Sequence, residues 1–178
     1  MIYGTLASTN NVVNINNKIY VIGGDINING VRSPTKKCQC YDVSTGYWCE
    51  IASLNSPRSS AGICTYNGKI YAMGGYSINN SLTTCEVYDP TTNTWSYIHS
   101  MQVARGEICA IPLNGTIYVY SGCSLVNGTP STINSSEAYN ISSDAWVSWT
   151  IPNVARYGYC LLYTSPSPRD KRQSRMPS

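Results

Sequence analysis

A segment of eight residues occurs three times along the chain at nearly constant spacing. Residues 17–24 read NKIYVIGG, residues 68–75 read GKIYAMGG and residues 115–122 read GTIYVYSG, at offsets of 51 and 47. A fixed period of this length indicates that each repeat folds as one supersecondary unit, which must stack on its neighbours to bury its apolar faces. The repeat therefore constrains the fold before any local structure is considered.

Two further markers keep the same register. A Tyr and a Trp stand seven residues apart in each unit, and an Arg recurs at offsets of 47 and 51. Arg58 and Arg105 each precede the first position of the glycine pair by sixteen residues. The markers are Gly23, Gly24, Gly74, Gly75 and Gly122; Tyr41 with Trp48, Tyr88 with Trp95 and Tyr139 with Trp146; and Arg58, Arg105 and Arg156.

Each unit contains four short β-prone runs. In the second unit, residues 63–66 and 70–73 flank Asn67-Gly68, the strongest two-residue hairpin signal, and residues 84–89 and 95–98 flank the turn 90–93. Four strands in about 50 residues, repeated, predict the blades of a β-propeller. We expect an all-β protein with three four-stranded antiparallel blades at residues 1–52, 53–100 and 101–151, and the start of a fourth blade at residues 152–159.

The ordered set of a double glycine, a Tyr and Trp seven apart and a following Arg resembles the kelch repeat, and it covers nearly all of residues 8–159. Residues 88–95, YDPTTNTW, are particularly similar to kelch-like proteins of the BTB type. The resemblance implies a kelch-type β-propeller fragment that binds proteins or peptides without catalysis. It further implies substrate recruitment to a cullin-RING ubiquitin ligase through a BTB domain upstream, and actin binding is the alternative.

Departures from the repeat yield two expectations. Ser121 replaces the first glycine of the third unit, which questions a backbone conformation with positive φ at that position. Ala7 stands where the first unit should carry its Arg, so we expect that unit to be degenerate or cut short. Because three blades cannot close a ring, we expect the chain expressed alone to be unstable or oligomeric.

The repeated markers are interpreted as structural. Large rings at one position per blade are explained by packing between blades. The arginines are explained by hydrogen bonds to the backbone, and the alternative is that they bind acidic peptides. Specificity is expected in the variable loops 25–36, 76–83 and 123–135. Related kelch domains bind partners with corresponding loops, so the resemblance makes Arg32, Tyr76, Asn79 and Asn80 candidate partner-binding residues.

Several other functions are disfavoured by the composition. Residues 160–178 contain four basic residues and one acidic residue, which accounts for the whole net charge of +3, so the body offers no electrostatic basis for nucleic-acid binding. No apolar run approaches the roughly 20 residues of a membrane span. Some kelch propellers are copper oxidases, but His99 is the single histidine, so we predict no catalytic residue, metal or cofactor. The eight cysteines are predicted to be reduced, in a cytoplasmic protein.

The repeat stops after residue 159. Residues 160–170, CLLYTSPSPRD, match the translation of a sequence that resembles a common transposase sequencing adaptor. We therefore expect residues 160–178 to be a disordered artefact of library preparation rather than part of the native protein.

Overall fold

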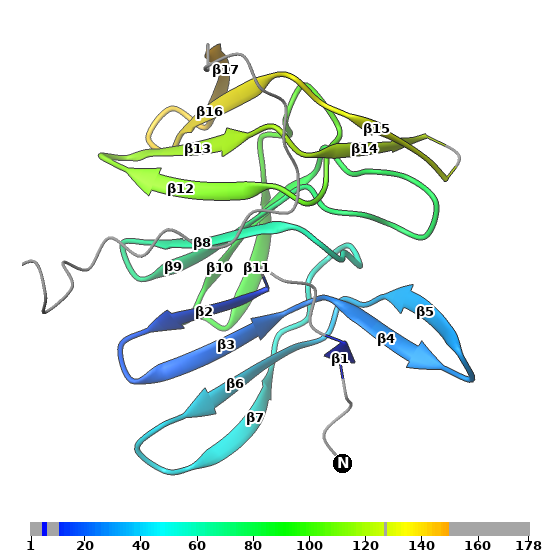
Figure 1. Ribbon diagram of the computed structural model, residues 1–178. Helices are drawn as coiled ribbons and strands as arrows, with labels where there is room; N and C mark the ends of the chain where they lie inside the picture. The colour runs from blue at the N-terminus through cyan, green and yellow to red at the C-terminus, as the bar shows by residue number, and fades with distance from the viewer. Residues whose placement is uncertain (1–4, 7–10, 127, 150–178) are drawn as a thin grey trace, which may run out of the picture.

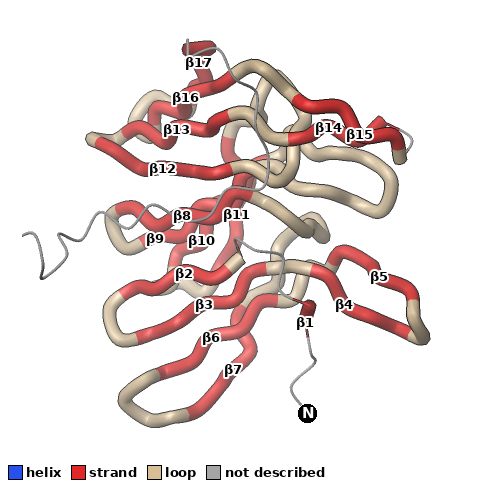
Figure 2. The backbone as a smooth tube through the Cα atoms, viewed as in Figure 1, coloured by secondary structure: helices blue, strands red, loops and turns tan. Residues whose placement is uncertain are grey.

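Three four-stranded antiparallel sheets follow one another along the chain, one for each sequence repeat (Figure 1). The computed structural model describes residues 5–6, 11–126 and 128–149, and every regular element within these ranges is a β-strand (Figure 2). The predicted all-β class and the kelch-type propeller fragment are therefore confirmed. The predicted Arg156, the start of a fourth blade at residues 152–159 and the segment 160–178 lie outside the described residues, as does Ala7.

Each sheet forms one blade with its strands in sequence order. Blade 1 comprises β2 (Val12–Ile15), β3 (Lys18–Ile22), β6 (Cys38–Asp42) and β7 (Tyr47–Ile51). Blade 2 comprises β8 (Gly62–Tyr66), β9 (Lys69–Met73), β10 (Cys85–Asp89) and β11 (Thr94–Ile98). Blade 3 comprises β12 (Cys109–Leu113), β13 (Thr116–Tyr120), β16 (Ser136–Asn140) and β17 (Ala145–Trp149).

Two of the three variable loops contain hairpins of their own. In blade 1, β4 (Asp25–Ile28) pairs with β5 (Val31–Pro34) and with the short strand β1 (Thr5–Leu6). In blade 3, β14 (Cys123–Val126) pairs with β15 (Thr129–Thr132). Both hairpins project from the same side of the stacked blades, at the right in Figure 1. Residues 25–36 and 123–135, expected from the sequence to be loops, therefore each contain a pair of strands.

The core lies between the blades rather than within a single sheet. One cluster of buried side chains joins blades 1 and 2, with Tyr20, Ile22, Ile63 and Tyr88 among its members. A second cluster joins blades 2 and 3. Because both faces of blade 2 are covered by a neighbouring blade, its central strand β9 is buried from Ile70 to Met73.

The glycine pairs adopt left-handed conformations that end the second strand of each blade. Gly74 and Gly75 have φ values of 56° and 98°, and Ser121 and Gly122 have 50° and 105°. The doubt raised about Ser121 was wrong, because the serine keeps the conformation of the glycine that it replaces. Its buried hydroxyl donates a hydrogen bond to the Ile133 carbonyl at 2.8 Å, which offsets part of the strain of a left-handed non-glycine residue.

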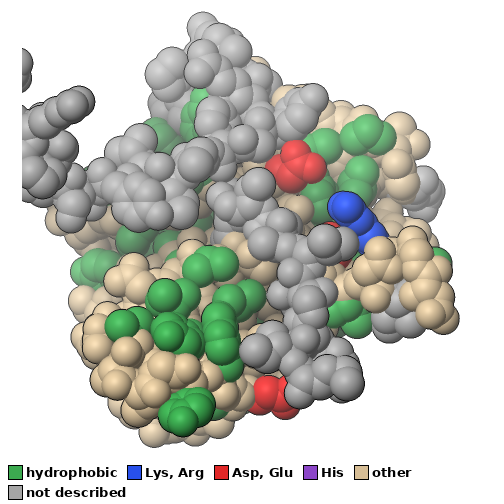
Figure 3. Space-filling model, turned by 60° about the horizontal axis from the view of Figure 1, so that its bottom comes forward, with side chains coloured by type: hydrophobic (Ala, Val, Ile, Leu, Met, Phe, Trp, Pro, Cys, Tyr) green, Lys and Arg blue, Asp and Glu red, His purple; other side chains and the backbone are tan. Residues whose placement is uncertain are grey.

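Hydrophobic side chains remain exposed on blade 1, two of them on its edge strand β7. Figure 3 brings the bottom of Figure 1 forward and shows such side chains gathered over this blade. Tyr47 is 76% exposed and Trp48 is 41% exposed, whereas the equivalent Trp95 and Trp146 are each 8% exposed. In the part of the chain that the structure describes, no helix has the length and apolar character of a membrane span.

Candidate functional site

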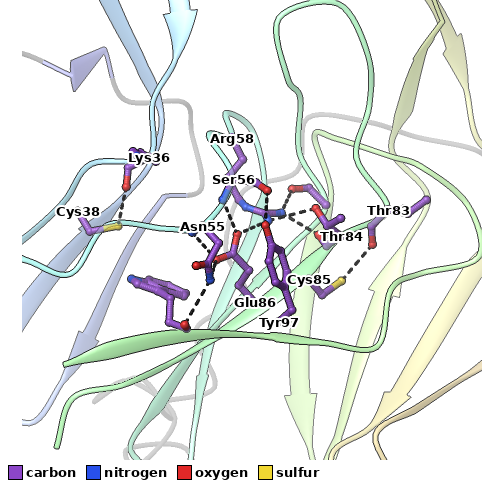
Figure 4. A network of polar contacts seen from close by, with 12 residues as sticks. Lys36, Cys38, Asn55, Ser56, Arg58, Thr83, Thr84, Cys85, Glu86 and Tyr97 are labelled. Carbon is purple, nitrogen blue, oxygen red and sulfur yellow. Dashed lines mark hydrogen bonds and ion pairs between the residues drawn. The ribbon is translucent and has the colours of Figure 1, made fainter. Parts of the chain in front are cut away.

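Arg58 and Arg105 are buried inside their own blades. Arg58 donates from Nη1 to the carbonyls of Gly74 at 2.6 Å and Thr84 at 2.8 Å (Figure 4). Arg105 makes the matching bonds to the carbonyls of Ser121 at 3.0 Å and Ser135 at 2.6 Å. The sixteen-residue spacing in the sequence therefore corresponds to a hydrogen bond from the guanidinium to the first position of the glycine pair. Burial lowers the pKa of Arg105, and the charge of Glu137 opposes that shift.

Sequence reasoning missed the carboxylates that complete these networks. Glu86 lies 2.6 Å from Arg58, and its carboxylate also accepts hydrogen bonds from the backbone N–H groups of Asn55 and Ser56. Glu137 lies 2.9 Å from Arg105 and accepts from two N–H groups of the segment between blades 2 and 3. Both glutamates stand two residues before the repeated Tyr, and this spacing could have identified them. Gln39 occupies that position in blade 1.

The repeated aromatic residues pack together and connect successive blades. The rings of Tyr88 and Trp95 lie 5.1 Å apart, and those of Tyr139 and Trp146 lie 5.2 Å apart. The Trp95 indole donates to the Ala52 carbonyl at 2.9 Å, at the exit of blade 1. The Trp146 indole makes the equivalent bond to the carbonyl of His99 at 2.7 Å. These contacts show that the aromatic markers pack between blades. The single histidine, His99, takes part through its backbone carbonyl.

Three of the four candidate partner-binding residues are exposed. Arg32 lies on β5 of the blade 1 hairpin, and Asn79 and Asn80 lie in the loop that follows β9 of blade 2. Tyr76 differs from the expectation because it is only 9% exposed. Its ring covers Gly106, where an added Cβ would lie 2.7 Å from the ring, and its hydroxyl donates to the Cys123 carbonyl at 3.3 Å. The structure thus places Tyr76 between blades 2 and 3.

Backbone hydrogen bonds join the loop of blade 2 to the hairpin of blade 3. The N–H of Ser81 donates to the Leu125 carbonyl at 3.2 Å, and the N–H of Leu125 donates to the Ser81 hydroxyl at 2.6 Å. The N–H of Gly128 donates to the Asn79 carbonyl at 3.2 Å. We call residues 77–81 together with β14 and β15 the joined loop surface. These bonds span the boundary between two blades and hold the two loops in one arrangement.

The joined loop surface is uncharged and partly apolar. Residues 76–83 and 123–135 contain no charged side chain. Ile78 is 70% exposed and Val126 is 63% exposed, and they lie among exposed Asn, Ser and Thr residues. The hairpin of blade 1 differs, because Arg32 is followed by Lys36 in the same variable loop and by Lys37 directly after it. The surface can therefore offer apolar contacts and neutral hydrogen-bonding groups from two blades, with positive charge beside blade 1.

At the opposite end of the blades, the tight turns of blades 1 and 2 border a hollow of about 530 Å³. Two of its lining residues, Lys18 and Lys69, form ion pairs with Asp42 at 3.4 Å and Asp89 at 3.0 Å. Among the described residues, no group of three His, Cys, Asp or Glu side chains is placed to hold a metal ion. The seven cysteines in this part of the chain carry free thiols.

Comparison with known sequences agrees with this architecture. The sequence profile of the kelch motif matches residues 8–55 and 57–102, which is just over half of the chain. Kelch-like protein 22 of Xenopus tropicalis is 32% identical over 75 residues, covering 42% of this chain and 12% of that protein. Kelch repeat and BTB domain-containing protein 13 of Mus musculus is 33% identical over 64 residues, covering 36% and 14%.

A third relative, Kelch-like protein 24 of Rattus norvegicus, is 37% identical over 71 residues, covering 40% of this chain and 10% of the relative. The matched part is therefore 10% to 14% of the length of these curated relatives. Two kelch motif matches coincide with the sheets of blades 1 and 2, and the third repeat builds the same sheet in blade 3. The chain belongs to the kelch motif family.

Proposed function

We propose that the chain is a non-catalytic protein-interaction module that binds a protein or peptide at its joined loop surface. The hydrogen bonds between Ser81 and Leu125 carry this proposal, because they fix two variable loops of different blades as one surface. A surface that is already ordered loses little conformational entropy when a partner binds. The exposed Ile78 and Val126 supply apolar contact area, and Asn79 and Asn80 supply neutral hydrogen-bonding groups.

The role of the module is proposed to be substrate recognition for a cullin-RING ubiquitin ligase. The relatives named Kelch-like protein and Kelch repeat and BTB domain-containing protein support this proposal. In such an adaptor, the kelch blades bind the substrate while a BTB domain contacts the ligase. The expected site of action is the cytoplasm.

Peptide binding tests the interaction role. The chain is screened against a displayed peptide library, and the affinity of each selected peptide is measured by calorimetry. Replacing both Asn79 and Asn80 with Ala is expected to weaken binding about fivefold or more, since each lost hydrogen bond contributes about 0.5–1.5 kcal/mol. Thr45→Ala, in the exposed turn at the opposite end of blade 1, is the matched control and should leave the affinity unchanged.

Two further measurements distinguish the proposed role in a ubiquitin ligase from the alternative role in binding actin. The native transcript is read upstream of the Met1 codon, and an in-frame BTB domain there supports the adaptor role. Co-sedimentation of the chain with filamentous actin, with no peptide selected from the library, would instead favour the cytoskeletal role. Equal peptide affinities of the Asn79 and Asn80 double variant and the wild type would overturn the assignment of the joined loop surface.

A further inference from the structure

Two cysteines face each other across the last hairpin of blade 1. Cys40 on β6 is the direct register partner of Cys49 on β7. Directly opposed residues in an antiparallel pair have Cα atoms about 4.5–5.5 Å apart, which falls within the roughly 4.4–6.8 Å that a disulfide spans. Side chains of such partners lie on the same face of the sheet, so the two thiols can meet without a change of register.

The two thiols differ in their access to solvent. Cys40 is 2% exposed and belongs to the core between blades 1 and 2, where Tyr20 contacts it, whereas Cys49 is exposed. Burial raises the pKa of Cys40, and its interaction with Cys49 acts in the same direction. An exposed thiol reacts first with a dissolved oxidant, and the buried thiol beside it is placed to react second.

The equivalent positions of the other blades show that the fold does not require thiols there. Blade 2 has Val87 opposite Ser96 in this register, and blade 3 has Ala138 opposite Val147. Packing of the hairpin is therefore achieved with aliphatic residues or with an aliphatic and a hydroxyl residue. Blade 1 alone among the described blades places two sulfur atoms at this pair of positions. Packing does not require them, and two adjacent thiols can undergo oxidation to a disulfide.

We propose that Cys40 and Cys49 form a peroxide-responsive thiol pair that closes into a cross-strand disulfide. The thiolate sulfur of Cys49 attacks one oxygen of a peroxide, the O–O bond breaks, and hydroxide leaves as Cys49 becomes a sulfenic acid. The Cys40 sulfur then attacks the Cys49 sulfur and expels hydroxide, which combines with the Cys40 proton as water. Two thiols lose two electrons and two protons in total, and hydrogen peroxide is reduced to two waters.

The remaining described cysteines lack this combination of an exposed thiol and an adjacent partner. Cys38, Cys85 and Cys123 are buried, and burial raises the pKa of Cys38 to about 11 and that of Cys85 to about 12. Cys64 on β8 interacts with Cys109 on β12, but Cys64 is buried and its pKa is raised by burial. The pair in blade 1 should therefore oxidise before the others.

The test uses the whole 178-residue chain, reduced, freed of reductant and titrated with hydrogen peroxide. After alkylation of the remaining thiols, chymotrypsin cleaves behind Tyr41 and Tyr47, which separates the two cysteines into different peptides. We expect a disulfide-linked peptide pair containing Cys40 and Cys49, formed at about tenfold lower peroxide than oxidation of the buried thiols and reversed by dithiothreitol. A disulfide that joins other cysteines first, including Cys64 to Cys109, overturns the proposal.

Variants copied from blade 2 keep the register and separate the two roles. In Cys40→Val, no neighbouring thiol is left to attack the Cys49 sulfenic acid. We therefore expect dimedone to trap this sulfenic acid in several-fold greater yield than in the wild type. In Cys49→Ser, it expects Cys40 to stay reduced over the same peroxide range. Oxidation of Cys40 in Cys49→Ser at the wild-type rate contradicts the proposed order. If a variant fails to fold, the peptide map of the wild-type chain still decides whether the disulfide forms.

Discussion

The guanidinium of Arg58 and the carboxylate of Glu86 meet 2.6 Å apart with both side chains fully buried. The pair lies between the segment that enters blade 2 and the third strand of that blade, and it is hydrogen-bonded to backbone on both sides. Burial of a charge is costly unless the charge is paired and hydrogen-bonded, so each partner offsets the desolvation cost of the other. The same arrangement recurs in blade 3 with Arg105 and Glu137.

Removing one partner of this pair should destabilise the chain strongly. Glu86→Ala leaves the Arg58 charge buried and is expected to lower the free energy of unfolding by about 3–5 kcal/mol. Gln39→Ala, at the equivalent position of blade 1, is the control and should lower it by no more than about 1.5 kcal/mol. Urea unfolding followed by tryptophan fluorescence measures both variants, and equal effects of the two would refute the argument.

The indole hydrogen bond of Trp95 predicts that replacing Trp95 lowers stability more than replacing Trp48. Trp95→Phe loses the bond to the Ala52 carbonyl while most of the ring packing remains, so unfolding should become easier by about 1–2 kcal/mol. Trp48→Phe alters a side chain that is 41% exposed and should change stability by less than about 0.5 kcal/mol. Thermal unfolding of the two variants side by side provides the measurement. A larger loss in Trp48→Phe would contradict the assignment.

Asp89 should make stability depend on pH in acid. Hydrogen bonds from Thr91 and then from Lys69 lower the pKa of Asp89 to about 2, against about 3.9 for an unfolded chain. Its contribution is therefore fully present above about pH 4 and is lost as the pH falls toward 2. Carboxyl NMR titration measures the pKa directly. In Asp89→Asn, the urea midpoint should lose this part of its dependence on pH, and an unchanged slope between pH 4 and 2 would count against the prediction.

Substitution at the two left-handed positions before the variable loops should change stability to different extents. At Gly74, a Cβ would meet the Arg105 carbonyl and lie 2.7 Å from the Met101 methyl, so Gly74→Ala is expected to destabilise by about 2 kcal/mol or more. Ser121→Gly relieves left-handed strain but removes the hydroxyl bond to Ile133, so its net effect should stay within about 1 kcal/mol. Denaturant unfolding of both variants decides whether Ser121 is tolerated for this reason.

The aromatic side chains exposed on the edge strand of blade 1 should promote self-association of the isolated chain. Tyr47→Ser removes a side chain that is 76% exposed, and it is expected to reduce the oligomer fraction in sedimentation velocity at a given concentration. Thr45→Ser, in the neighbouring turn, serves as the control. A wild-type chain that sediments as a monomer and unfolds cooperatively would remove the basis for this expectation.

Much of the fold could be predicted because its determinants are local and repeated. The turn Asn67-Gly68 has φ values of 47° and 73°, as a two-residue hairpin requires, and the strands on both sides were expected from their composition. The hairpins β4–β5 and β14–β15 were missed although the same Asn-Gly dipeptide occurs at residues 29–30 and 127–128. The second strands of these hairpins, VRSP and TPST, are rich in polar residues and lack a clear alternation, so their composition gave no strand signal.

The candidate site was harder to predict because it depends on contacts between repeats. Asn79 and Asn80 were identified from loop position alone, and both are exposed. The burial of Tyr76 follows from Gly106, which lies 30 residues away and leaves room for the ring. Likewise, the bonds of Ser81 to Leu125 join positions 44 residues apart. No local pattern within one unit reports such pairings, whereas comparison of equivalent positions between units would have revealed Glu86 and Glu137.

The spacing of each arginine from its partners also affects how such a chain can change in length. The side chain of Arg58 bonds to residues 74, 84 and 86, and that of Arg105 bonds to residues 103, 121, 135 and 137. The segments that form blades 2 and 3 therefore each contain both partners of their buried ion pair. A gene duplication that copies one whole unit adds a blade whose ion pair is already satisfied, while insertions after the glycine pair lengthen a surface loop without separating the partners. Such a chain can gain repeats and diversify its loops independently.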